Sequence, residues 1–327
     1  MKKRGRSLMD NIAKSNEFSF RVDTDWAKLP AGWSFFEVAD VATDSQDRVF
    51  VFCRGEHPVM VFARDGSFLF SWGEGLFKRA HGITIGPEDS LYCVDDLDHT
   101  VKKFTPEGKL LLTVGTPGKP AAFQGGAPFN QPTKVALEPG TGAFYVSDGY
   151  GNARVHKYSV EGELLFSWGR FGSDPGEFNL VHSVCTDRQG RVYVADRESH
   201  RIQVFDDTGR YITQWNNLHR PCGFFITQGA PQLAIIGQIP PSLKVNTRYP
   251  NLGARITIHS LDGKRLASIG ETSPGEELPT QFLAPHGIAT DSRGDIYIGE
   301  VAYSHFGEAS TPPPWKRRCF RKLIRLV

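Results

Sequence analysis

The sequence contains 327 residues, of which 39% are hydrophobic and 23% are charged, and its formal net charge is +2. These proportions are typical of a globular chain with a full core, and acids and bases are interspersed, so we predict no nucleic-acid interface. The chain has no run of about 18 apolar residues, and we therefore predict no membrane-spanning segment. The 34 glycines and 21 prolines are typical of many short strands joined by tight turns.

The N-terminal segment MKKRGRSLMDNIAKSNEF begins with basic residues but has no apolar stretch of the length that a secretion signal requires. We predict a flexible tail over residues 1–17 and a single domain over residues 18–327. The five cysteines are odd in number and lie in apolar strand patterns. This indicates reduced core residues in a cytoplasmic protein rather than a disulfide framework. The sequence predicts no particular oligomeric state.

One unit of roughly 40 to 50 residues recurs along the chain, a period typical of propellers and solenoids. In chain order, the copies start near Phe35, at His81, at Thr133, at His182, near Arg220 and at Phe282. Each complete copy contains four short alternating runs separated by glycine turns, which predicts the four antiparallel strands of a propeller blade. The sixth copy lacks a fourth strand, and the segment FSFRVD at Phe18–Asp23 can supply it and close the ring. We therefore predict an all-β, six-bladed β-propeller.

Aligning the first strand of every copy gives one equivalent position per blade. These positions are Ala39, His81, Thr133, His182, Cys222 and His286. Histidine occupies alternate blades, which lie about 120° apart in a six-fold ring, so the three imidazoles are predicted to point at the axis. Three neutral imidazoles with an open position are typical of a catalytic zinc site. The alternative interpretation is that each histidine is a capping or core residue at the mouth of its blade.

We predict that His81, His182 and His286 bind one divalent metal ion. Zinc is the first choice because histidine-only sites suit it, and iron, copper, cobalt and nickel are compatible with the same ligand type. Three further residues are expected at the rim of this pocket, because they follow the second strands of their blades: Arg54 in RGEH, Tyr150 in SDGYGNAR and Arg197 in ADRE. An arginine pair suits a carboxylate or a polarised carbonyl. The alternatives are a packed tyrosine bonded to backbone and arginines in ion pairs with Glu56, Asp196 or Glu198.

The stretches GxFYVSDGYGNARVHKYSVEGELLFSWG and VYVADRESHRIQVF are similar to NHL repeats. With the motifs RGEH, DGYxNxR and ADRExxR and the three histidines, the whole ring resembles the peptidyl-α-hydroxyglycine α-amidating lyase family. The resemblance covers essentially the full chain after about Gly32. It implies catalytic roles for Tyr150, Arg54 and Arg197. A tyrosine near a metal and a guanidinium can ionise well below its reference pKa of about 10 and act as a base.

The chain departs from the resembled family at several positions. The family uses a structural calcium on the axis, held by two backbone carbonyls and an Asp; the corresponding residues are Val41, Ile83 and Gly287. Glycine supplies no carboxylate, so calcium is not favoured here. Ala284 replaces an active-site methionine of the family and is expected to widen the pocket. The family's paired cysteines are absent, in agreement with a reduced compartment.

The resemblance implies a lyase that splits a carbinolamide into an amide and an aldehyde. A cytoplasmic location favours a small carbonyl- or carboxylate-bearing substrate over a secreted peptide. Two alternatives remain from other classes of protein. One is a metal-dependent hydrolase of the lactonase type, against which a histidine-only site argues because known propeller lactonases use carboxylate-rich calcium sites. The other is a non-catalytic NHL interaction module, which predicts an axis without metal.

Overall fold

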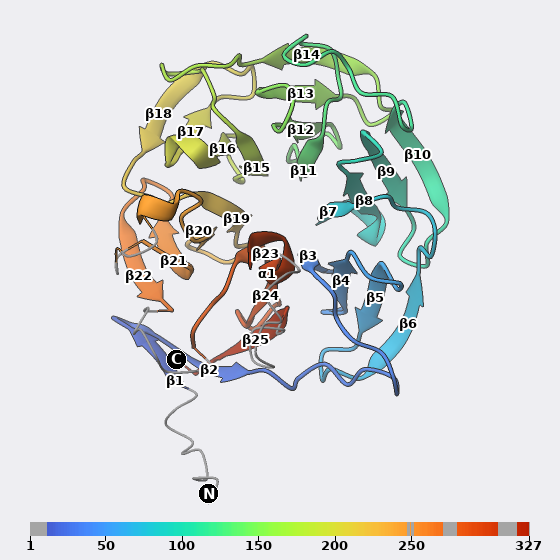
Figure 1. Cartoon of the computed structure of the whole chain (residues 1–327), viewed down its shortest axis with the longest axis vertical. Helices are drawn as coiled ribbons and strands as arrows, with labels where there is room; N and C mark the ends of the chain where they lie inside the picture. The colour runs from blue at the N-terminus through green and yellow to red at the C-terminus, as the bar shows by residue number, and fades with distance from the viewer. Residues whose placement is uncertain (1–11, 247–248, 250–251, 271–279, 307–318, 327) are drawn as a thin grey trace, which may run out of the picture.

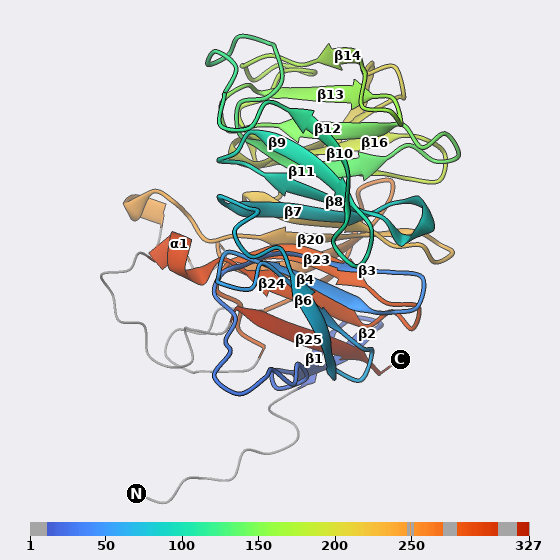
Figure 2. The same cartoon turned by 90° about the vertical axis from the view of Figure 1, so that its right-hand side faces the viewer.

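A computed structural model describes residues 12–246, 249, 252–270, 280–306 and 319–326 of the chain. Six antiparallel sheets are arranged as a ring around one axis (Figure 1). This arrangement confirms the predicted six-bladed β-propeller. Seen from the side, the short helix α1 (Ala302–Phe306) lies on one face of the ring (Figure 2).

Five blades each consist of four consecutive strands in which every strand pairs with the next along the chain. Blade one contains β3 (Val38–Thr43), β4 (Val49–Cys53), β5 (Val59–Phe62) and β6 (Phe68–Trp72). Blade two contains β7 (Ala80–Ile85), β8 (Leu91–Asp95), β9 (Thr100–Phe104) and β10 (Leu110–Gly115). Blade three contains β11 (Pro132–Leu137), β12 (Phe144–Asp148), β13 (Arg154–Tyr158) and β14 (Leu164–Trp168).

Blades four and five follow the same order. Blade four contains β15 (Val181–Thr186), β16 (Val192–Asp196), β17 (Arg201–Phe205) and β18 (Tyr211–Trp215). Blade five contains β19 (Pro221–Ile226), β20 (Leu233–Gln238), β21 (Arg255–Ser260) and β22 (Arg265–Ile269). Single-turn 3-10 helices lie at η2 (Pro87–Asp89), η3 (Arg197–Ser199) and η4 (Lys244–Asn246). The degenerate fifth copy of the repeat is therefore a complete blade.

The last blade combines the two ends of the described chain. It contains β23 (Pro285–Thr290), β24 (Ile296–Glu300), β25 (Phe320–Arg325), β2 (Phe18–Asp23) and β1 (Ile12–Ser15). Strand β2 pairs antiparallel with β25, with Phe20 opposite Arg325 and Val22 opposite Leu323. The prediction that FSFRVD closes the ring is confirmed. Because β2 covers the edge of β25, the backbone groups of that edge are hydrogen-bonded.

The N-terminal boundary differs from the sequence prediction. We expected residues 1–17 to form a flexible tail, but Ile12–Ser15 form β1, a fifth strand beside β2. The backbone N–H of Ser268 in blade five donates to the Ser15 hydroxyl at 3.0 Å, so β1 also joins the last blade to its neighbour. Residues 1–11 lie outside the described part of the chain.

The core lies between neighbouring blades rather than in one central cluster. Second strands such as β12 and β16 are buried over their full length because sheets cover both of their faces. Tryptophans on outer strands pack beneath the glycine turn of the following blade. A Cβ on Gly108 (φ +88°) would lie 2.6 Å from the Trp72 ring, so this turn requires glycine for its conformation and for this contact.

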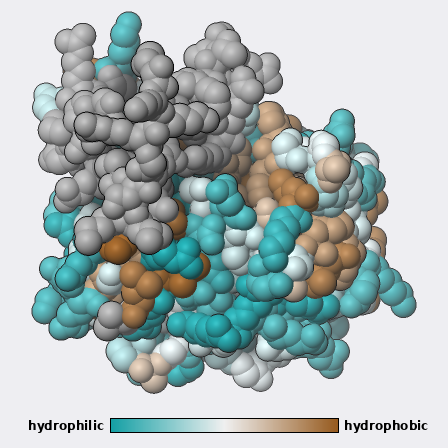
Figure 3. All heavy atoms as spheres, turned by 90° about the horizontal axis from the view of Figure 1, so that it is seen from below, coloured by the Kyte–Doolittle hydropathy of each residue, from teal (hydrophilic) through white to brown (hydrophobic). Residues whose placement is uncertain are grey.

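The five cysteines form no disulfide bond among the described residues, and four of them are buried, as expected for core residues. In the part of the chain that the structure describes, no helix has the length and apolar character needed to cross a membrane. The surface around the closing blade is largely hydrophilic, with separate hydrophobic patches between the polar residues (Figure 3).

Removing the Phe20 side chain is expected to weaken ring closure. Phe20 is 2% exposed and packs in the core cluster shared by blades five and six. Replacing a buried phenylalanine by alanine costs about 3–5 kcal/mol, so Phe20→Ala is expected to lower the free energy of unfolding by that amount in chemical denaturation. Arg21→Ala, on the exposed face of β2, is the matched control with an expected loss below about 0.5 kcal/mol. Equal stability of the two variants would contradict closure by β2.

Candidate metal centre

Three histidines converge on the propeller axis from alternate blades. His81, His182 and His286 come from β7, β15 and β23, and each is at most 8% exposed. One ring nitrogen from each lies within 4.8 Å of those of the other two. The ring centroids are 4.8 to 5.0 Å apart. The geometric part of the prediction, that these imidazoles meet on the axis, is confirmed.

The orientation of each ring is fixed by the neighbouring blade. The Nδ1 atoms of His81 and His286 lie 2.8 Å from Thr133 O and 2.6 Å from Ala39 O, and His182 Nδ1 lies 3.2 Å from Cys222 O. A carbonyl oxygen only accepts, so Nδ1 of each ring carries the proton and donates. In the neutral imidazole this leaves Nε2 with a free lone pair, which is the tautomer that a metal ligand requires. The acceptors occupy the three blades that lack histidine at this position.

Electrostatics keep the three imidazoles neutral. Burial lowers the pKa of His81, His182 and His286 well below the usual value of 6.5. The positive charges of Arg54 and Arg197 lower the pKa of His81 further, and Arg197 has the same effect on His182. Neutral imidazoles are the form that coordinates metals.

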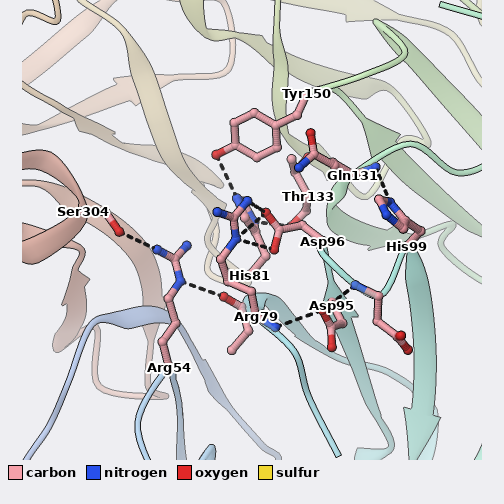
Figure 4. Close-up of polar contacts among 12 residues, drawn as sticks. Arg54, Arg79, His81, Asp95, Asp96, His99, Gln131, Thr133, Tyr150 and Ser304 are labelled. Atoms are coloured by element: carbon pink, nitrogen blue, oxygen red, sulfur yellow. Dashed lines mark hydrogen bonds and ion pairs between the residues drawn. The ribbon is translucent and has the colours of Figure 1, made fainter. Parts of the chain in front are cut away.

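Tyr150 places its hydroxyl directly between two of the rings. Its Oη lies 3.1 Å from His81 Nε2 (Figure 4) and also 3.1 Å from His182 Nε2. A phenol has one proton and can donate to only one of these lone pairs. The alternative interpretation, a hydroxyl bonded to backbone, is not what the structure shows. Burial raises the pKa of Tyr150, while Arg197 and Arg54 act in the opposite direction, so the protein groups alone do not produce the lowered value that we expected.

Arg197 lies against Tyr150 and is held by a carboxylate. Its guanidinium is 5.5 Å from the Tyr150 ring centroid, and its Nη1 is 3.5 Å from the tyrosine oxygen. Arg197 Nε donates to Glu198 at 2.8 Å, and Arg220 Nη2 donates to the same carboxylate at 2.7 Å. Although burial alone would raise it, Arg220 and Arg197 lower the pKa of Glu198 to about 2. Arg197 therefore forms the ion pair with Glu198 that was the alternative interpretation, and it also lies in the pocket beside Tyr150.

Arg54 connects the pocket to helix α1. Its Nη1 donates to the Ser304 hydroxyl at 2.9 Å (Figure 4). Nη1 also donates to Glu37 at 2.8 Å, and Nε donates to Ala80 O at 3.0 Å. Glu37 is 2% exposed and also accepts the Ser304 backbone N–H at 2.6 Å. The partner of Arg54 is thus Glu37, and not Glu56, Asp196 or Glu198. These bonds fix Arg54 beside the residue that precedes His81.

A further ion pair in the pocket was missed by sequence analysis. Arg79 donates through Nε to both carboxylate oxygens of Asp96, at 2.8 and 2.9 Å, and Nη2 also bonds to this fully buried group. The Arg79 charge acts on both His81 and Tyr150. Asp96 follows the second strand of blade two. Arg54 and Arg197 occupy the same repeat position in blades one and four. This equivalence is the signal that identifies Asp96 in the sequence.

The carboxylate that ends the second strand of a blade positions its first strand. Asp95 accepts the backbone N–H groups of Lys78 and Arg79, at 2.6 and 3.0 Å. Asp196 likewise accepts from Asn179 and Leu180. These carboxylates therefore have a structural role, because they hold the backbone just before His81 and His182.

The side of the pocket that is formed by blade five and the last blade is apolar. Ala284, Cys222, Ile239 and Val301 form one buried cluster. The expectation that alanine at position 284 widens the pocket stays a prediction; Ala284 itself is 1% exposed and packs against these neighbours. The Cys222 sulfur lies 3.4 Å from His182 Nδ1, and burial raises the pKa of this thiol to about 11. The thiol is therefore protonated at neutral pH, a form that is a poor metal ligand.

The donor set fits a divalent metal ion. Three buried Nε2 lone pairs share the axis, and the hydroxyl proton of Tyr150 satisfies only one of them. Carbonyl acceptors on Nδ1 fix each ring, as the outer-shell partners of metal-binding histidines do. The histidines can hold the metal, and imidazole as the ligand type is compatible with zinc and other first-row metals.

Fold and site together define a six-bladed β-propeller with a buried histidine triad on its axis. An NHL repeat model matches residues 178–205. NHL repeat-containing protein 3 from Homo sapiens is 33% identical over 309 residues, covering 88% of this chain and 83% of the relative. The chain belongs to the NHL repeat-containing protein family.

The resemblance to amidating lyases is also confirmed. Peptidyl-alpha-hydroxyglycine alpha-amidating lyase 1 from Drosophila melanogaster is 31% identical over 254 residues, covering 72% of this chain and 45% of that protein. Among solved structures, a gluconolactonase from Xanthomonas campestris has a TM-score of 0.61 at 13% identity, over 98% of this chain and 94% of the other. At this identity the likeness concerns the fold alone.

We predict that the histidine triad determines metal content. Purified wild type, analysed by mass spectrometry after loading with zinc and gel filtration, is expected to contain about one equivalent of metal. His182→Ala removes one of three ligands and is expected to contain less than about one tenth of that. His200→Ala changes an exposed histidine of the same blade and is expected to match wild type. Equal metal in all three proteins would place the ion elsewhere.

Proposed function

We propose that this protein is a metal-dependent lyase that cleaves the C–N bond of a small carboxylate-bearing carbinolamide. The observation that carries the proposal is the position of the Tyr150 hydroxyl, 3.1 Å from two Nε2 atoms and beside Arg197. The similarity to a peptidyl-alpha-hydroxyglycine alpha-amidating lyase supports the reaction class. The products would be an amide and an α-oxo acid.

His81, His182 and His286 would hold the metal, which when bound polarises an oxygen ligand and lowers the pKa of acidic groups beside it. Tyr150 would act as a phenolate, whose Oη accepts the proton of the substrate hydroxyl and becomes a neutral phenol. The electrons of that O–H bond form the aldehyde C=O, the C–N bond breaks, and the nitrogen takes its electron pair. The same proton then passes from Tyr150 to the nitrogen, so the reaction consumes no water and no other reactant.

The pocket has a charged side and an apolar side, which together would orient the substrate. Arg54, Arg79 and Arg197 are each held by a carboxylate, so their guanidinium groups are oriented before substrate binds. They would bind the substrate carboxylate. Ile239 and Val301, which cover Ala284, would face the acyl group. Arg79 extends the set of arginines that the sequence identified and is 35% exposed, which leaves part of its side chain accessible.

Turnover of N-benzoyl-α-hydroxyglycine tests the proposal directly. Zinc-loaded wild type is expected to form benzamide and glyoxylate in equal amounts, above the rate without protein. Tyr150→Phe removes the proton acceptor and is expected to lower kcat about 100- to 1,000-fold while metal content stays unchanged. Tyr211→Phe on an outer strand is the matched control. No turnover by metal-loaded wild type would favour the non-catalytic NHL module, and lactone hydrolysis instead would favour the lactonase alternative.

The role of Arg79 is separable from that of Tyr150. Arg79→Gln is expected to raise KM for N-benzoyl-α-hydroxyglycine about 10-fold or more, because a charged contact to the carboxylate is lost. The KM for N-(hydroxymethyl)benzamide, which has no carboxylate, is expected to stay within about 2-fold of wild type. Arg210→Gln, at an arginine whose side chain is 84% exposed, controls for charge. Equal effects on both substrates would contradict carboxylate binding by Arg79.

A further inference from the structure

A buried ion pair crosses the propeller axis directly below the histidines. It joins Asp40 of β3 to Lys134 of β11, which follow Ala39 and Thr133 and so occupy the next position on the inner strands. Their side chains are 5% and 13% exposed. At the same position three other blades carry glycine, at Gly82, Gly223 and Gly287.

The ion pair ties together three blades through the backbone N–H and C=O of one residue, Ile83. Lys134 Nζ donates to the Asp40 carboxylate and, at 2.9 Å, to the carbonyl oxygen of Ile83 in blade two. The Ile83 backbone N–H donates to Asp40 Oδ2 at 2.8 Å, and the Val41 N–H donates to Oδ1 at 2.9 Å. The ammonium group is therefore surrounded by a carboxylate and a carbonyl oxygen, which are the ligand types that hard cations such as calcium prefer.

Calcium does not fit this axis as it would in the resembled family. The Ile83 carbonyl, one of the expected ligands, already accepts a hydrogen bond from Lys134 Nζ. Gly287 cannot be exchanged for the family's Asp in this backbone, because a Cβ there would lie 2.3 Å from the Asp40 Cα. The carboxylate at the axis is thus that of Asp40 in blade one, and the cation beside it is the ammonium group of Lys134.

We propose that the Lys134 ammonium is the permanent axial cation of this protein and takes the place of a structural calcium ion. A cation attached covalently to β11 does not dissociate, so the stability of the fold is independent of free calcium. Burial raises the pKa of Asp40, and Lys134 and two backbone N–H groups oppose this effect. Removing the ammonium alone would leave a buried carboxylate without its counter-ion, which is strongly destabilising.

The same ion pair separates two openings of the axis. The histidines lie on one side of it, and on the other side a cavity of about 1490 Å³ opens, lined by Val41, Ile83, Lys134 and Phe224 among others. A ligand entering from that face would meet Lys134 before the histidines. Lys134 bonds Asp40 and the Ile83 carbonyl, so its positive charge has a structural role that differs from the role of the arginines in the metal centre.

The test compares thermal unfolding of metal-stripped protein with added CaCl2 or ZnCl2, for wild type and Lys134→Met. Wild type is expected to show no change of Tm with calcium and less than about 0.1 equivalents of bound calcium. Lys134→Met keeps an unbranched side chain without the charge, and its Tm is expected to fall by roughly 5–10 °C. Saturating calcium is expected to restore roughly 5 °C or more, because Asp40 and the Ile83 carbonyl become available as ligands. The double variant Asp40→Asn, Lys134→Met lacks the carboxylate and is expected to show no calcium response.

One equivalent of calcium in wild type, or a rise of its Tm with calcium alone, would overturn the proposal. A folded Lys134→Met variant with no calcium response, or with the stability of wild type, would overturn the assignment of Lys134 to a cation site. If this variant does not fold, the wild-type calcium measurements decide the question. None of these readouts involves turnover, so they are independent of the proposed lyase activity.

Discussion

The pairing of β2 with β25 is the constraint on which the remaining structure depends. It converts a row of sheets into a closed ring, and closure places the six inner strands around a single axis. Three histidines on alternate strands meet only because these strands have equivalent positions around that axis. The strand β1 reinforces closure by contacting both the last blade and blade five.

The contacts between neighbouring inner strands determine the chemistry of the axis. Each histidine donates Nδ1–H to a carbonyl of a blade that has no histidine, so the ring is fixed and the Nε2 lone pairs converge. One position further along the strands, Asp40 and Lys134 neutralise each other. The axis therefore holds two layers. The histidine layer has unpaired nitrogen lone pairs, and in the Asp40–Lys134 layer the two charges cancel.

Much of this organisation could be predicted because it follows the repeat. The six blades, the closing strand and the histidine positions depend on residue types at fixed intervals, as do Arg54 and Arg197. Asp96, Asp40 and Lys134 also occupy repeat positions, but the pairing of Arg79 with Asp96 and of Asp40 with Lys134 does not follow from the repeat. Each joins residues whose distance depends on ring geometry and side-chain conformation, and Lys134 reaches Asp40 across an intervening blade. The strand at Ile12–Ser15 was missed because a short polar segment becomes a strand only through its pairing with β2.

We propose that the three imidazoles bind one metal ion through Nε2. A crystal structure of the zinc-loaded protein, with anomalous diffraction measured on both sides of the zinc absorption edge, tests it most directly. A single strong anomalous peak is expected on the axis, about 2.0–2.1 Å from Nε2 of His81, His182 and His286. Full zinc loading without a peak at these three atoms, or a peak bound by other residues, would contradict it.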